Sequence, residues 1–161
     1  LSTFASSTSA SAEMLTCKEP TAIAGAVMPV FDTSTKDGQR FWRFRKDICD
    51  QAAASGPNYN GHFTLIAYGC GATNNVCGVV VDRQNGNMIR VPDATTRYQT
   101  SIDDARVVIN PNVKDYDEEG VPGWLWRKVL IQKADGFELI GVDKGEREEL
   151  PNSIPENYSA G

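Results

Sequence analysis

The sequence has few of the residues that common catalytic and ligand-binding motifs need. His62 is the only histidine in 161 residues, and no Gly-x-Ser-x-Gly elbow or phosphate-binding glycine loop occurs. Lys and Arg number 16 against 21 Asp and Glu, and a net charge of −5 disfavours a nucleic-acid partner. No apolar run reaches the roughly 18 residues that a transmembrane helix requires. We therefore expect an acidic globular protein without a cofactor or a membrane span.

Composition divides the chain into three parts. Most of residues 1–13 are Ser, Thr or Ala, which bury too little apolar surface to offset their ordering entropy. We expect a flexible leader there, of the kind that follows a removed signal peptide, and hence a periplasmic or secreted protein. Residues 14–143 are expected to form one domain. Residues 144–161 are charged and contain two prolines, which predicts an extended or loose tail.

The four cysteines indicate disulfides. Cys70 and Cys77 flank a short polar segment that resembles a hairpin tip, so Cys17 and Cys49 are left to pair with each other. A zinc site is less consistent with the sequence, because there is no Cys-x-x-Cys pair and only one histidine. Free buried thiols in a cytosolic protein are the remaining alternative. We predict disulfides Cys17–Cys49 and Cys70–Cys77 and no metal site.

One amphipathic helix is predicted early in the domain. Phe41, Phe44, Ile48 and Ala52 recur at spacings of three and four residues within the segment Lys36–Ser55. Gly and Pro follow directly and end the pattern.

The rest of the domain has the composition of β-strands. Six strands are predicted, at 63–68, 78–82, 88–91, 105–109, 124–133 and 137–142, with a further edge strand at 27–31. Asn85-Gly86 is a strong hairpin signal, and short connections favour antiparallel pairing. The predicted fold class is therefore α+β. One N-terminal helix packs on a mainly antiparallel sheet or meander of about six strands, tied by disulfides.

One stretch carries a family resemblance. Asn58-Tyr59-Asn60-Gly61-His62-Phe63 is followed by Tyr68-Gly69-Cys70-Gly71, by Cys77 and by Val81-Asp82 with Gly86. This order resembles a family of uncharacterised exported bacterial proteins that read approximately Asn-Phe-x-Gly-His-Tyr, Trp-Gly-Cys-Gly, Cys and Val-Asp-x-x-x-Gly. The likeness spans about Phe41–Val142, although the cysteines are further apart here and Tyr68 replaces the usual Trp. The resemblance implies export and a disulfide-tied β domain, and it implies no reaction.

His62 is the main catalytic candidate. As a general base it would need an acidic partner to orient its ring, and Asp82 and Asp103 are the candidates. A disulfide-bonded Cys70 cannot act as a nucleophile, which removes a Cys–His pair. The simpler interpretation is that His62 forms a hydrogen bond at the sheet edge. We therefore expect no catalytic residue and keep a small envelope hydrolase as the alternative function.

Three other groups of residues each allow a functional interpretation and a simpler structural interpretation. Asp103 and Asp104 are consecutive, so on a strand they face opposite sides and are best explained as the start of a strand. The acidic run 115–119 lacks the ligand spacing of a calcium loop and is interpreted as a solvated loop. Trp124 and Trp126 could form a sugar-stacking platform, but a core face is the default.

The segment between Cys70 and Cys77 is the candidate binding site. Thr73, Asn74 and Asn75 are small or polar, and a disulfide around them would reduce the entropy lost on binding. The sequence therefore favours an exported binding protein, an inhibitor or immunity-type protein whose partner is a cell-wall-degrading enzyme. A sugar- or peptidoglycan-binding module using Trp124 and Trp126 is a further alternative.

Overall fold

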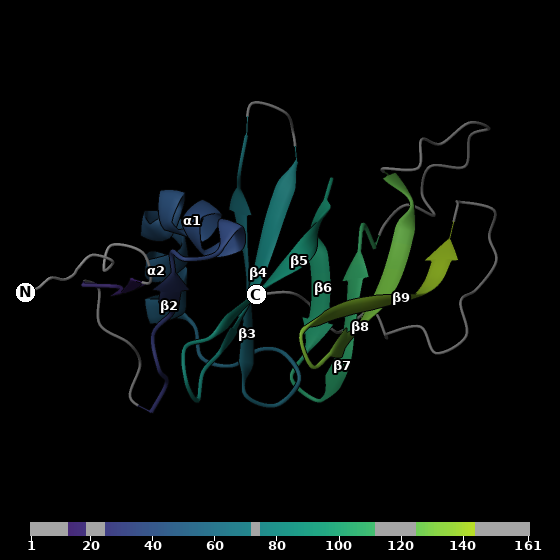
Figure 1. The fold of residues 1–161 in the computed structure, drawn as a ribbon. Helices are drawn as coiled ribbons and strands as arrows, with labels where there is room; N and C mark the ends of the chain where they lie inside the picture. The colour runs from purple at the N-terminus through teal and green to yellow at the C-terminus, as the bar shows by residue number, and fades with distance from the viewer. Residues whose placement is uncertain (1–12, 19–24, 72–74, 112–124, 144–161) are drawn as a thin grey trace, which may run out of the picture.

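A computed structural model describes residues 13–18, 25–71, 75–111 and 125–143 (Figure 1). In these residues the chain forms two helices and nine strands. In chain order they are β1 (Met14–Thr16), β2 (Val30–Asp32), α1 (Lys36–Arg43), α2 (Arg45–Ala54), β3 (Phe63–Gly69), β4 (Val76–Asp82), β5 (Met88–Ala94), β6 (Tyr98–Ser101), β7 (Asp104–Ile109), β8 (Arg127–Lys133) and β9 (Gly136–Asp143). Every strand pairing is antiparallel. A mixed α+β fold with mainly antiparallel sheets is confirmed.

The helix count and the strand count differ from the prediction. The single helix expected over Lys36–Ser55 is two helices, because the backbone leaves the helical conformation at Phe44. The apolar period continues across the break, since Phe41 in α1 and Ile48 in α2 face the same core. The described residues hold nine strands instead of about six, and the unexpected ones are the short strands β1 and β6.

Three layers build the fold (Figure 1). The central sheet has the order β3-β4-β5, with the helices on one face and the sheet β6-β7-β8-β9 on the other. Ile66, Val79 and Val81 of the central sheet join the core shared with the helices, whereas Leu65 and Val80 join the core shared with the second sheet. Burial on both faces explains why β3 and β4 are almost continuously apolar.

Both predicted disulfides are present. Cys17 and Cys49 bond the segment after β1 to α2, with their Cα atoms 5.9 Å apart. Cys70 and Cys77 bond the facing ends of β3 and β4, with Cα atoms 5.8 Å apart. Neither helix of the described segments has the length and apolar character that membrane crossing requires. Residues 1–12 of the expected leader and all of the tail 144–161 lie outside the described residues.

Arg83 connects several of these elements from a buried position. Its guanidinium donates hydrogen bonds to the carbonyls of Ala52 (3.0 Å) and Ser55 (2.8 Å) at the end of α2. It also donates to the carbonyl of Val27 (2.9 Å) and the hydroxyl of Thr64 (3.0 Å). The end of a helix carries partial negative charge, which suits a cation. One buried side chain therefore joins α2, β3, the segment before β2 and the β4–β5 turn.

Candidate functional site

The segment 58–63, which carries much of the resemblance, forms a structural turn. The side chain of Asn58 pairs with the backbone of Leu65, accepting from its N–H (2.8 Å) and donating to its carbonyl (3.3 Å). Asn60 and Gly61 adopt positive φ angles of 46° and 89°, a conformation that favours Gly and Asn. Their backbone N–H groups donate to carbonyls at the β6–β7 turn. The motif therefore attaches the central sheet to the second sheet.

His62 lies next to Asp82, one of its two expected partners. The distance from His62 Nε2 to Asp82 Oδ1 is 3.5 Å, and the two side chains are 40% and 19% exposed. The imidazole stacks on Phe63, with ring centroids 4.2 Å apart. Asp82 Oδ1 also accepts from the backbone N–H of Gln84 at 2.9 Å. Asp103 is exposed in the β6–β7 turn and makes no ion pair with His62 in the described residues.

The surroundings of His62 do not complete a hydrolytic site. In the described part of the chain, no hydrogen bond joins the imidazole to a hydroxyl or thiol that could serve as nucleophile. Asp104, next to Asp103, is engaged elsewhere: its hydrogen bonds from Arg106 hold the pKa of the carboxyl below its usual value. The Asp104 carboxylate is thus used in local structure.

A substitution tests the structural role of His62. His62→Asn is expected to lower the free energy of unfolding by about 1 kcal/mol, the value of one part-exposed polar contact. Urea unfolding of the variant and of the wild type measures the difference. A variant of unchanged stability that loses a hydrolytic activity of the wild type on cell-wall polymers would contradict this role.

Several predicted site residues lie outside the described residues. These are Thr73, Asn74, Trp124 and the acidic run 115–119. Asn75 is described and is exposed immediately before β4. Trp126 is half-buried, and its carbonyl accepts from the side chain of Asn110 at 3.3 Å.

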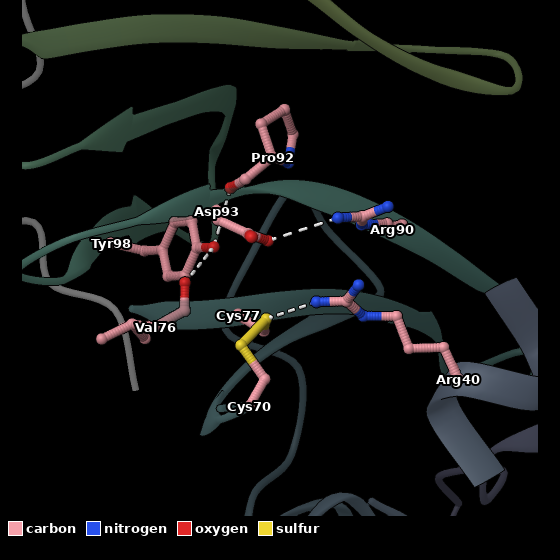
Figure 2. The surroundings of a disulfide bond; sticks show 8 residues. All are labelled: Arg40, Cys70, Val76, Cys77, Arg90, Pro92, Asp93 and Tyr98. Carbon is pink, nitrogen blue, oxygen red and sulfur yellow. Dashed lines mark hydrogen bonds and ion pairs between the residues drawn. A yellow bond between two sulfur atoms is a disulfide. The ribbon is translucent and has the colours of Figure 1, made fainter. Parts of the chain in front are cut away.

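Polar groups surround the Cys70–Cys77 disulfide (Figure 2). Arg40 reaches from α1, and its Nη2 donates to Cys77 Sγ at 3.0 Å. Arg90 and Asp93 of β5 form an ion pair with Nη2 and Oδ1 3.6 Å apart. The Asp93 carboxylate lies within 4.8 Å of both sulfur atoms. Cys70, Cys77 and Asp93 do not form a metal site in the oxidised protein, because the two sulfurs are bonded to each other.

Tyr98 supports the β4–β5 pair on its other face. Its hydroxyl donates to the carbonyl of Pro92 at 2.7 Å. Its ring lies against Gly78, so close that any Cβ on residue 78 would meet the ring at 2.7 Å. Burial raises the pKa of the Tyr98 hydroxyl well above its usual range. This tyrosine is therefore a structural donor and not an acid–base group.

An acidic groove of about 520 Å³ opens along β5. We call it the β5 groove. Its lining comes from β2 and the start of α1, from Met88, Ile89 and Arg90 of β5, and from the β8–β9 turn. Four aspartates contribute to it against the single arginine, namely Asp32, Asp37, Asp82 and Asp135. The sequence gives no sign of this groove, because its residues are far apart in the chain.

The strand β5 presents an unpaired edge to this groove. In the described sheets β5 pairs with β4 alone. The N–H of Asp82 donates to the carbonyl of Asn87, and Val80 pairs with Ile89. Hydrogen-bonded pairs alternate along an antiparallel ladder, so the backbone groups of Met88 and Arg90 point away from β4. The described residues provide no partner for them.

Comparisons with known proteins identify no relative. No protein-family model, no curated protein and no solved structure matches the chain. The groove, the sheet edge and the disulfides of the chain itself are therefore what indicates a function.

Proposed function

We propose that this chain is an exported binding protein that takes up an extended, basic segment of a partner protein in the β5 groove. The observation that carries this proposal is that Met88 and Arg90 line an acidic groove from a strand edge that has no partner in the described sheets. An exposed sheet edge can bind an extended segment as an added strand, with main-chain hydrogen bonds for affinity. Met88 and Arg90 together offer two N–H donors and two carbonyl acceptors to such a strand.

Charge defines the kind of partner. The groove carries four aspartates and one arginine, and the whole chain has a net charge of −5. Opposite charges across an interface accelerate association and exclude partners of the wrong sign. An enzyme that degrades anionic wall polymers needs basic residues at its substrate cleft, and an extended basic segment beside that cleft would complement the acidic groove. An inhibitor or immunity-type protein for such an envelope enzyme fits these features best.

The disulfides agree with an extracellular setting. Bonds such as Cys17–Cys49 and Cys70–Cys77 are stable in the periplasm and outside the cell and are rare in the cytosol. A periplasmic or secreted location remains part of the proposal.

A small envelope hydrolase is the second candidate. The His62–Asp82 distance of 3.5 Å favours it, since an acidic partner can orient an imidazole base. The sugar-binding alternative has no such support, because Trp126 is half-buried with its carbonyl engaged and Trp124 lies outside the described residues.

Selection from a displayed library of random short peptides tests the binding proposal. Peptides that bind the full chain are expected to be rich in Lys or Arg and free of proline. The double variant Asp37→Lys/Asp135→Lys should weaken their binding by about tenfold or more, equal to about 1.4 kcal/mol, because it reverses two charges of the groove. Calorimetry measures the affinity.

A matched control separates the groove from general charge effects. Asp47→Lys/Asp103→Lys makes the same charge change in the first turn of α2 and in the β6–β7 turn, both outside the groove lining. Asp47 corresponds to Asp37 in the first turn of α1, and Asp103 to Asp135 in a two-residue hairpin turn. The proposed site would be contradicted if the two double variants weakened peptide binding equally, or if neither variant weakened it.

A further inference from the structure

The two disulfides differ in their electrostatic surroundings. Cys77 is 2% exposed and its sulfur accepts a hydrogen bond from Arg40 Nη2 at 3.0 Å, whereas Cys70 is partly exposed (Figure 2). No cationic side chain donates to the sulfurs of Cys17 or Cys49 in the described residues. Cys70 is therefore the more exposed cysteine of the Cys70–Cys77 disulfide, and Cys77 is buried beside a guanidinium.

This arrangement favours one direction of bond cleavage. A neighbouring arginine stabilises a cysteine thiolate, and a stabilised thiolate is the better leaving group in thiol–disulfide exchange. Asp93 lies within 4.8 Å of both sulfurs and would oppose a thiolate, but its carboxylate is paired with Arg90 at 3.6 Å. The charged group that donates a hydrogen bond to Cys77 Sγ is thus the guanidinium of Arg40.

We propose that Cys70–Cys77 is a thiol–disulfide exchange site whose substrates are small thiols or protein dithiols. A substrate thiolate attacks Cys70 Sγ and forms a new S–S bond with it. The Cys70–Cys77 bond breaks, and its electron pair leaves on Cys77 Sγ as a thiolate held by Arg40. A second substrate thiolate then attacks the mixed disulfide on its substrate sulfur, releasing Cys70 as a thiolate. Two substrate thiols are oxidised to a disulfide, and the protein disulfide is reduced.

Reduction of the Cys70–Cys77 bond would change only the nearby ends of β3 and β4. The disulfide joins the ends of β3 and β4 next to the Gly69–Val76 pair, and the rest of that ladder extends to Phe63 and Asp82. The Cys17–Cys49 disulfide, at α2, is not involved. The exchange site shares Arg90 with the lining of the β5 groove, through the Arg90–Asp93 ion pair, but the exchange chemistry does not depend on the proposed function.

Equilibration of the full chain in buffers of reduced and oxidised glutathione tests the proposal. Alkylation and peptide mass mapping then identify each bond. We expect Cys70–Cys77 to open at lower thiol concentration than Cys17–Cys49, with glutathione attached to Cys70. Opening of Cys17–Cys49 first, or glutathione on Cys77, would overturn the proposal.

Variants of α1 separate electrostatics from packing. Arg40→Met is expected to reduce the equilibrium constant for opening Cys70–Cys77 by about tenfold. Arg40→Lys keeps the charge and should retain most of the wild-type value, and the exposed Arg43→Met should not change it. If Arg40→Met unfolds, the comparison of Arg40→Lys with Arg40→Gln decides. Equal constants for the charged and neutral variants would refute the role of Arg40.

Discussion

Arg83→Met is expected to lower the free energy of unfolding by about 3–5 kcal/mol, more than most single substitutions do. The guanidinium donates to three backbone carbonyls and to the hydroxyl of Thr64. Methionine fills a similar volume but removes the donor from two buried acceptors, the Ala52 carbonyl and the Thr64 hydroxyl, and from two part-buried carbonyls. Each buried acceptor left unsatisfied costs about 1–3 kcal/mol. Burial lowers the pKa of Arg83, and the carbonyls compensate part of the lost hydration.

Urea unfolding measures this loss, with Arg43→Met as the control. Arg43 is exposed on α1, so its replacement should change the free energy of unfolding by less than about 0.5 kcal/mol. A loss below about 1 kcal/mol for Arg83→Met would show that water or a rearranged backbone replaces the arginine, and the connecting role of Arg83 would be wrong.

Gly38→Ala is expected to destabilise the protein by about 2–3 kcal/mol. Within a helix this replacement normally stabilises by about 1 kcal/mol, so the expected sign is reversed. The reason is the close contact between α1 and β2: a Cβ at residue 38 would collide with the carbonyl group of Asp32, whose carbon is 2.5 Å away. A backbone group cannot move aside as a flexible side chain can.

Gly56→Ala is the matched control, since a Cβ there meets nothing within 4 Å. Thermal and urea unfolding of both variants give the comparison. A neutral or stabilising effect of Gly38→Ala would mean that α1 does not lie against β2, and the shape of the β5 groove would have to be revised.

Local signals predict much of this fold. Asn85-Gly86 marks the β4–β5 hairpin, and the spacing of Cys70 and Cys77 marks the β3–β4 connection. The break at Phe44 has no such signal, because the apolar period continues through it. Strand β6 is absent from the prediction because Gln99 and Thr100 are polar, yet both are buried in the structure. The polarity of a residue can be read from the sequence, whereas its burial depends on which layer of the fold covers it.

Less of the candidate site than of the fold can be predicted from the sequence. Asp82 is a predictable neighbour of His62, since a residue at a strand end can lie beside the start of the adjacent strand. The connecting role of Arg83 is not predictable, because its acceptors are mostly backbone carbonyls, which have no sequence signature. Asp37 and Asp135 contribute to the same groove from opposite parts of the chain, and nothing local relates them.

Amide hydrogen exchange at β5 tests the central claim most directly. NMR on the full chain, with and without a basic peptide from the displayed library, follows the N–H groups of Met88, Ile89 and Arg90. We predict that the peptide slows exchange at Met88 and Arg90, whose N–H groups point away from β4 on the strand that lines the β5 groove, and leaves Ile89, which faces β4, unchanged. Binding of the peptide with unchanged exchange at both Met88 and Arg90 would contradict strand addition in the β5 groove.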